Sequence, residues 1–419
     1  MTSDDGSGYG RIAVVLSEDE TLTHVDFGTP MGELMRRYWQ PVALSAELLD
    51  LPKRIRILCE DLIVFRDRNG RAGMLGLKCC HRGTSLEYGR IEDDGIRCCY
   101  HGWKFDTEGR CLEQPGEPPQ SDYYEKVHQP WYPVHEYGGL VFAYMGPPDK
   151  KPEFPIYDIW LQENFKLHAY RNVSRGVVAE CNWLQIQENA TDPFHTYFLH
   201  SMHSGLQFTD AYAARPDVAF SRTPISVQYI RDAILPNENL FRRVGENFVP
   251  NSRSLPPQTE TGNTPQLERG RYIGWWVPVD NTHAIGFHIE TLKVEDDGGT
   301  DGSVWAEAAP GRSNVYQEPT RDYEDTQRRP DDREAQVGQG PIAARARENL
   351  ATTDQGIVMV RRMLHEALAA IDRGEDPPGI IRNPDNRTVP VGARNEVVAP
   401  GREPVRNQQP VEVSATTGA

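Results

Sequence analysis

The sequence predicts an α+β fold in which a small all-β domain precedes a larger mixed domain. Between residues 54 and 145, short apolar runs alternate with Gly, Asp and Asn, a pattern typical of short strands. Residues 156–300 mix strand-like runs with one helical stretch, and residues 340–373 carry apolar residues at helical spacing. A chain of 419 residues is long enough for two domains, each with its own core.

Residues 1–45 are expected to form an N-terminal segment that contains a helix and then a turn at Pro41. The β domain should cover residues 46–150. It contains an Arg-Asn-Gly step at 68–70, which is a hairpin signal, and it ends at the Pro- and Lys-rich linker GPPDKKPEFP.

The larger domain should cover residues 151–375. Its last part, 340–373, is predicted to be helical because the apolar residues Ile357, Val360, Leu364 and Leu368 share one face. Residues 376–419 are rich in Pro, Arg and Asn, which predicts an extended or disordered tail.

Composition excludes several classes of partner. The net charge of −16 disfavours nucleic acid. No run approaches the roughly 20 apolar residues that cross a bilayer, and the acidic N-terminus lacks the pattern of a signal peptide, so a cytoplasmic protein without a membrane partner is expected. Seven cysteines, four of them clustered, favour metal binding over disulfides in such a compartment.

The segment KCCHRGTSLEYGRIEDDGIRCCYHGWK contains two metal-competent pairs, Cys79 with His81 and Cys98 with His101. Two thiolates and two imidazoles could hold a structural zinc ion or a two-iron, two-sulfide cluster. Zinc fingers usually take like ligands from the same element, whereas each loop here gives one Cys and one His. The spacing therefore favours the [2Fe-2S] cluster, with both cysteines on one iron and both histidines on the other.

A second set of candidate ligands lies in ENATDPFHTYFLH. Glu188, Asp192 and His195 fall on one face of a helix. His200 would point about 140° away from His195 in an ideal helix, and a π-type widening would bring it back. Two histidines and one carboxylate would leave positions on Fe(II) open for O2, but two histidines at this spacing, taken alone, are more often surface or core residues.

These motifs resemble the Rieske non-heme iron oxygenases. The CxH and CxxH pairs, CCYHGWKFD and DPFHTYFLH carry the resemblance, which covers roughly residues 25–375 and is nearest to the phthalate-dioxygenase-like group. It implies a Rieske [2Fe-2S] domain followed by a catalytic domain with an antiparallel sheet flanked by helices, similar to a helix-grip fold. The implied cofactors are the Rieske cluster and a mononuclear Fe(II).

The resemblance also assigns roles to residues. Asp354 in TTDQGIVMVRR is the expected third iron ligand, beside His195 and His200. Four other acids in the preceding polar stretch are expected to be solvated: Asp322, Asp325, Asp331 and Asp332.

Three further roles follow by the same resemblance. Asp192 would bridge His101 of one subunit and His195 of the next, as the catalytic link between the two metal centres. Glu188 would support the iron site from outside the ligand shell. His283 would contact the substrate, with a strand histidine satisfied by its neighbours as the alternative.

The implied activity is that of an oxygenase component that oxidises an aromatic acid with O2. A separate NAD(P)H-dependent reductase with flavin and an iron–sulfur cluster would supply electrons, since the chain lacks a Gly-rich dinucleotide motif. Head-to-tail homotrimers, or stacked hexamers, are expected. O-demethylation of a methoxylated acid, with release of formaldehyde, is one alternative, and an electron carrier without catalytic iron is another. Arginines that could bind the substrate carboxylate stay open among Arg215, Arg222, Arg231 and Arg242.

Overall fold

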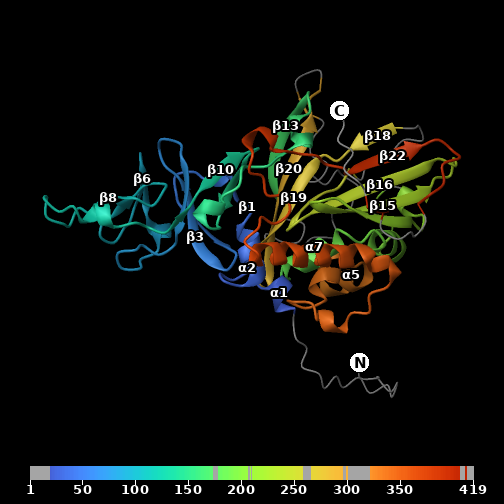
Figure 1. Cartoon of the computed structure of the whole chain (residues 1–419), viewed down its shortest axis with the longest axis horizontal. Coiled ribbons are helices and arrows are strands. Elements are labelled where there is room, and N and C mark those ends of the chain that lie inside the picture. Colours follow the sequence, from blue (N-terminus) through green and yellow to red (C-terminus); the bar gives the residue numbers. More distant parts are fainter. Residues whose placement is uncertain are drawn as a thin grey trace, which may run out of the picture.

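The computed structural model describes residues 19–172, 178–205, 208, 210–257, 266–295, 299–300, 321–405 and 411–412. The first 18 residues of the predicted N-terminal segment, and residues 406–410 and 413–419 of the predicted tail, lie outside this set. Figure 1 shows a smaller β part on the left and a large sheet with helices on the right. Within the described residues, no helix is both long enough and apolar enough to cross a membrane.

The smaller part contains three antiparallel sheets. The first has the order β1 (Trp39–Leu44), β11 (Leu140–Tyr144) and β10 (Val134–Tyr137). The second has the order β2 (Lys53–Ile57), β3 (Glu60–Arg66), β4 (Ala72–Gly76) and β9 (Trp131–Tyr132). The third has the order β5 (Arg90–Glu92), β6 (Gly95–Arg97), β7 (Lys104–Phe105) and β8 (Cys111–Glu113).

Two turn predictions have different outcomes. The hairpin at 68–70 is confirmed, because it joins β3 to β4 and Gly70 has a φ of +86°. The turn at Pro41 is wrong, since β1 runs through Pro41 with a local irregularity of register. Proline is tolerated there because β1 is an edge strand, where a missing N–H breaks no ladder.

The N-terminal helices lie with the larger part of the molecule. They are α1 (Glu20–Thr23) and α2 (Pro30–Arg36), and both contact α7 (Gln355–Asp372). Figure 1 shows the three helices together below the large sheet. The N-terminal segment thus ties the two parts together, because β1 follows α2 directly and joins the smaller part.

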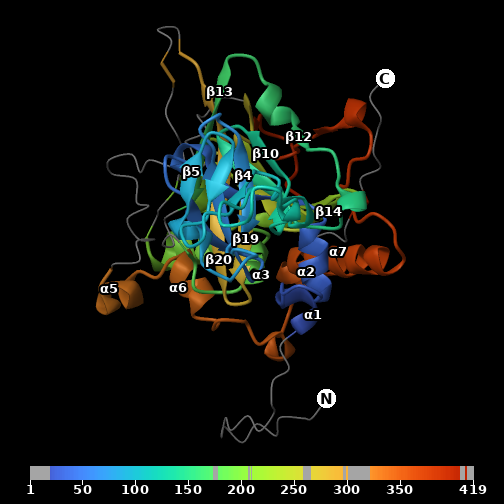
Figure 2. The same cartoon turned by 90° about the vertical axis from the view of Figure 1, so that its left-hand side faces the viewer.

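The larger part is built on a ten-stranded sheet that is antiparallel apart from its last pair. Its main order is β13 (Phe165–Asn172), β20 (His283–Lys293), β19 (Tyr272–Asp280), β17 (Ser252–Ser254), β16 (Leu240–Phe248), β15 (Ser226–Ile234), β14 (Asp217–Arg222) and β23 (Val411–Glu412), and β22 (Arg394–Val398) pairs with both β16 and β18 (Gln266–Arg269). Figure 2 shows β4 and β5 of the smaller part in front of this sheet.

Helices flank this sheet, which confirms the predicted α+β fold. They are α3 (Trp183–Asn189), α4 (His195–Tyr197), a π-helix (Phe198–His203), α5 (Tyr323–Arg328), α6 (Asp332–Val337) and α7. Helix α3 packs on β19, and α7 packs on β14 and β15. Val360, Leu364 and Leu368 of α7 are buried as predicted, whereas Ile357 is only half-buried.

The predicted helix over 340–373 is too long, because α7 begins only at Gln355. The backbone of 340–343 is bonded to α3 instead: Gln185 Nε2 donates to Gly340 O, and Ala343 N donates to Gln185 Oε1. These bonds take the groups that a helix would use for its own ladder.

The predicted tail is also corrected. Residues 394–398 are extended, but as strand β22 they are paired on both sides within the large sheet. A further short strand, β21 (Thr388–Val389), pairs with β12 (Ile156–Tyr157) just after the linker. The C-terminal segment is therefore a structural part of the larger domain, to which it contributes β22 and β23.

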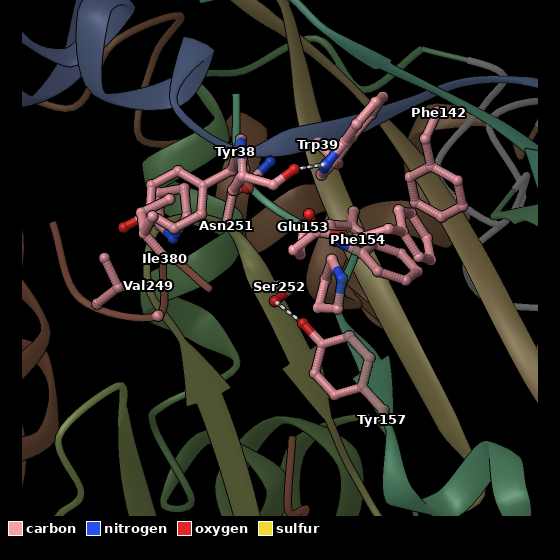
Figure 3. A pocket seen from close by; sticks show the side chains of 15 residues that line it. Tyr38, Trp39, Phe142, Glu153, Phe154, Tyr157, Val249, Asn251, Ser252 and Ile380 are labelled. Atoms are coloured by element: carbon pink, nitrogen blue, oxygen red, sulfur yellow. Dashed lines mark hydrogen bonds between the residues drawn. The ribbon is translucent and has the colours of Figure 1, made fainter. Parts of the chain in front are cut away.

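An aromatic pocket lies where β1, the linker and the C-terminal segment meet (Figure 3). Trp39 Nε1 donates to Pro152 O, and Tyr38 OH donates to Pro378 O. The volume of this pocket is about 50 Å³, well below the roughly 150 Å³ of a cavity that admits benzene. The pocket is therefore a small gap between packed elements.

Candidate metal centres

Two loops of the smaller part have the same backbone closure. In the first, Gly83 N donates to Cys79 O, and in the second, Gly102 N donates to Cys98 O. Both glycines are in the left-handed region, with φ of +76° and +73°, which favours glycine over residues with a side chain. The two loops therefore present a Cys and a His each in similar fashion.

In these loops the two cysteines contact each other, and so do the two histidines. Cys79 and Cys98 are buried, each with 3% exposure, while His81 and His101 are half-buried with ring centroids 4.6 Å apart. Trp103 stacks on His81 at 4.1 Å. Two inner thiols and two outer imidazoles fit a cluster with sulfur ligands on one iron and nitrogen ligands on the other.

A network of charged residues fixes the second loop. Arg97 Nη1 donates to Gly102 O at 2.7 Å, and its other nitrogens donate to Glu92 and Glu113. Hydrogen bonding from Arg97 lowers the pKa of Glu92 to about 2. The orientation of this loop thus depends on an ionised Glu92.

In the larger part, two histidines and one aspartate converge. Asp332 Oδ1 lies 3.5 Å from His195 Nε2 and 3.3 Å from His200 Nε2, and the three side chains offer ligand atoms within 4.8 Å of one another. His200 lies in the π-helix, which confirms the predicted widening. The ring centroids of the two histidines are consequently 5.3 Å apart.

Each imidazole is held at its other nitrogen by an aspartate. His195 Nδ1 donates to Asp192 O, and His200 Nδ1 lies 3.5 Å from Asp331 Oδ1. Asn189 Nδ2 donates to Asp332 Oδ1 at 3.2 Å. Burial lowers the pKa of His195, which favours the neutral ring that ligates metals. These contacts leave both Nε2 atoms directed at Asp332.

The structure corrects the acid at this site. Asp354 is absent from the convergent group of the described residues, and its Oδ2 accepts a hydrogen bond from Ala351 N at the start of α7. The prediction that Asp331 and Asp332 are solvated is wrong, because the two residues are buried, with exposures of 0% and 9%. Asp331 caps α6 in a capping box with Glu334, and that D-x-x-E spacing was the available signal for a helix carrying Asp332.

Glu188 lies on α3 and is buried. It accepts hydrogen bonds from Arg345 at 3.3 Å and from Arg361 of α7 at 2.6 Å. The Glu188 carboxylate therefore links α3, which precedes the histidines, to the chain that follows Asp332.

The predicted substrate contact at His283 is not supported. Its Nδ1 lies 2.9 Å from Asp280 Oδ1 in the turn between β19 and β20. That turn is attached to the N-terminal segment, because Val25 N donates to Asn281 Oδ1. His283 thus lies at the junction of the two parts and outside the group formed by His195, His200 and Asp332.

Comparison with known proteins places these features. Residues 38–133 match the profile of the Rieske [2Fe-2S] domain. The chain is 40% identical over 404 residues to the phenoxybenzoate dioxygenase subunit alpha of Ectopseudomonas oleovorans, covering 93% of this chain and 94% of that one. It is also 40% identical to a tert-butanol monooxygenase / tert-amyl alcohol desaturase oxygenase subunit of Aquincola tertiaricarbonis, covering 90% of this chain and 82% of that one. Identity to the 5,5'-dehydrodivanillate O-demethylase oxygenase subunit of a Sphingobium strain is 33%, covering 89% and 85%.

Solved structures agree on the fold. NdmA of Pseudomonas putida CBB5 superposes with a TM-score of 0.61 at 19% identity, covering 81% of this chain and 93% of that one. Dicamba monooxygenase gives a TM-score of 0.58 at 18% identity, covering 81% and 99%. Together with the sequence relatives, which are 33–40% identical over most of their length, they show that the chain belongs to the Rieske non-heme iron oxygenases, as an oxygenase (alpha) subunit.

Proposed function

We propose that His195, His200 and Asp332 hold a catalytic mononuclear iron, with which the chain oxidises an aromatic acid. The observation that carries this proposal is the convergence of the three ligand atoms within 4.8 Å. Two histidines and one carboxylate on one side of Fe(II) leave the other positions open. Iron bound there would supply the binding and reductive activation of O2.

The surrounding residues prepare this site. Asp192 and Asp331 set the tautomers of the two rings, which raises their basicity as ligands. Phe208 lies against His200 with ring centroids 5.0 Å apart, so it covers one side of the site with an apolar surface. The ring nitrogens and Asp332 would thus be fixed before a metal binds.

The oxygenase needs electrons from outside. We infer a separate NAD(P)H-dependent reductase as partner, since the relatives are named as oxygenase subunits. A cytoplasmic location remains a prediction that suits such a donor.

Transfer between the two centres is proposed to cross a subunit interface in a homotrimer, or in a stacked hexamer. The third sheet of the smaller part, which holds the second cluster loop between β6 and β7, lies at the end of the molecule remote from the large sheet (Figure 1). Asp192 would accept hydrogen bonds from His195 of its own chain and from His101 of a neighbouring copy.

An aromatic acid is the substrate class favoured by the names of the relatives, which include phenoxybenzoate and phthalate dioxygenases. O-demethylation is the second candidate, because one relative is a dehydrodivanillate O-demethylase subunit. The electron-carrier alternative is set aside, since the chain matches oxygenase subunits over most of its length.

The test is turnover of the purified protein with a surrogate reductase, NADH and ¹⁸O2. The substrates are phenoxybenzoate, phthalate, methoxylated biaryl acids and tert-butanol. We expect ¹⁸O in a hydroxylated product of an acid, and formaldehyde in step with NADH oxidation would identify an O-demethylase. Oxidation of tert-butanol alone would contradict the proposed substrate class.

A further inference from the structure

Two arginines lie side by side on one face of the large sheet. Arg231 of β15 and Arg243 of β16 are direct cross-strand partners, and their exposures are 1% and 2%. Like charges directly opposite each other on neighbouring strands are unfavourable. A buried pair of this kind therefore calls for a compensating negative charge.

The described part of the chain supplies no carboxylate within ion-pair distance of either guanidinium, and their hydrogen-bond partners are neutral. Arg231 Nη2 donates to the carbonyl oxygens of Ala211 and Ala214, at 3.1 and 3.2 Å, while its Nε and Nη1 are buried without a partner. Arg243 donates to Tyr229 OH, Pro257 O and Asn395 Oδ1.

Burial lowers the pKa of Arg231, and the charge of Arg243 lowers it further, whereas the neighbouring Tyr212 raises it. A guanidinium nevertheless stays protonated in proteins. Leaving a buried charge unpaired is costly, and a bidentate anion is the partner for which the arginine fork is suited.

Aromatic rings connect this pair to the candidate iron site. The guanidinium carbons of Arg231 and Arg243 lie 4.7 and 5.8 Å from the ring centroid of Tyr212. Tyr212 contacts Phe208 at 5.2 Å, and Phe208 contacts His200 at 5.0 Å. The distance from the arginines to His200 is thus bridged by two aromatic rings.

The sheet face that carries the pair also faces the iron site. Side chains alternate along β16, so Asn247 shares a face with Arg243. Asn247 Nδ2 donates to Ala190 O, at the end of α3 and just before Asp192. The arginines therefore belong to the inner surface of the catalytic part.

The other arginines considered from the sequence do not meet these conditions. Arg222 is paired with Glu366, Arg242 is paired with Asp232 on the opposite face, and Arg215 is exposed. Of the four, only Arg231 is buried without a carboxylate partner. Adjacent residues of a strand point to opposite faces, so Arg242 faces away from Arg231 and the next residue of β16, Arg243, lies beside it.

Building on the proposed function, we infer that Arg231 and Arg243 bind the carboxylate of the substrate and direct its far end toward His195 and His200. Two rings, Phe208 and Tyr212, separate the arginines from His200. The arrangement fits an acid with two aromatic rings, such as a diaryl ether or a biaryl acid, better than an acid with one ring.

Calorimetric titration of the iron-loaded protein tests this assignment. The ligands are phenoxybenzoate, the neutral phenoxybenzyl alcohol, phthalate and 3-chlorobenzoate. Arg231→Gln and Arg243→Gln should each weaken phenoxybenzoate binding about 10- to 100-fold, the range for a charge-assisted hydrogen bond, with little change for the alcohol. Arg222→Gln, a change of the same kind on β14, should bind both ligands as the wild type does. Wild-type protein should bind phenoxybenzoate more tightly than 3-chlorobenzoate.

Arginine variants that keep the Rieske visible spectrum and bind phenoxybenzoate with wild-type affinity would overturn the assignment, because the arginines would then serve only the fold. If Arg231→Gln does not fold, Arg243→Gln decides alone. Wild-type protein that binds none of the acids, or prefers the alcohol, would also overturn it. The oxygenase proposal would still stand in that case if the alcohol were hydroxylated with ¹⁸O.

Discussion

Single side chains decide how the candidate iron site is arranged. His195 and His200 each have one nitrogen held by an aspartate, and each directs the other nitrogen at Asp332. The partner of His200 is Asp331, which is fully buried and also caps α6. The residue beside the ligand thus fixes both the helix that carries the ligand and the opposite imidazole.

Asp331→Asn should weaken iron binding about 10- to 100-fold, because an amide holds the tautomer of His200 less strongly than a carboxylate does. Asparagine is still a good helix cap, so the fold should persist. The measurement is iron retention against a chelator. Asp385→Asn, at an exposed position, is the control and should retain iron as the wild type does.

At this scale, sequence reasoning found the histidines and missed the acid. DPFHTYFLH places His195 and His200 within one local segment, so their spacing alone indicated a shared site. The acid lies more than a hundred residues further along the chain, and at that separation the sequence spacing does not indicate a contact. The segment RRPDDRE also has the composition of a solvated stretch. Its burial arises from tertiary contacts, such as the bond from Gln185 Nε2 to Gln336 O.

Among the elements, the two cluster loops and the π-helix were predictable because their signals are local. The long helix over 340–373 was not, because Gln185 of α3 takes the backbone groups of 340–343. The tail was missed for a related reason: β22 is paired with β16 and β18, and such distant pairing leaves no mark on the composition of the segment.

The second cluster loop should be sensitive to acid through Glu92. The pKa of Glu92 is lowered from 4.5 to about 2 in the folded protein, so the stability that its charge contributes is present above about pH 4.5 and is lost as the pH falls toward 2. Glu92→Gln should weaken the cluster loop already at neutral pH and flatten this acid limb. Visible circular dichroism of the Rieske cluster against pH is the measurement. If Glu92→Gln gave the same pH profile as the wild type, the Glu92 carboxylate would not contribute to the stability of the loop.

At the scale of the whole molecule, the two candidate metal centres of one chain lie on different parts: the cluster loops on the smaller part and the iron site on the larger part. The N-terminal segment, the linker and the C-terminal segment join these parts at several places, for example through Tyr38 OH and Pro378 O. A junction of this kind favours a fixed orientation of the smaller part, as a ring of subunits with matched centres requires.

Asp192→Asn tests the proposed route between subunits. Asparagine keeps an oxygen to accept the bond from Phe194 N, so the local turn and both metal centres should be retained. Loss of the carboxylate should slow turnover about 10- to 100-fold. The reoxidation rate of the reduced Rieske cluster, measured in a single turnover with substrate and O2, reports the step directly. A wild-type rate would remove Asp192 from the route.

The central claim is that Asp332, rather than Asp354, completes the catalytic iron site. The most direct measurement is the iron and sulfide content of Asp332→Ala and Asp354→Ala beside the wild type. Wild-type protein and Asp354→Ala should contain about three irons and two sulfides per chain, whereas Asp332→Ala should retain the Rieske spectrum with about two irons. Full iron content in Asp332→Ala together with loss in Asp354→Ala would contradict this account.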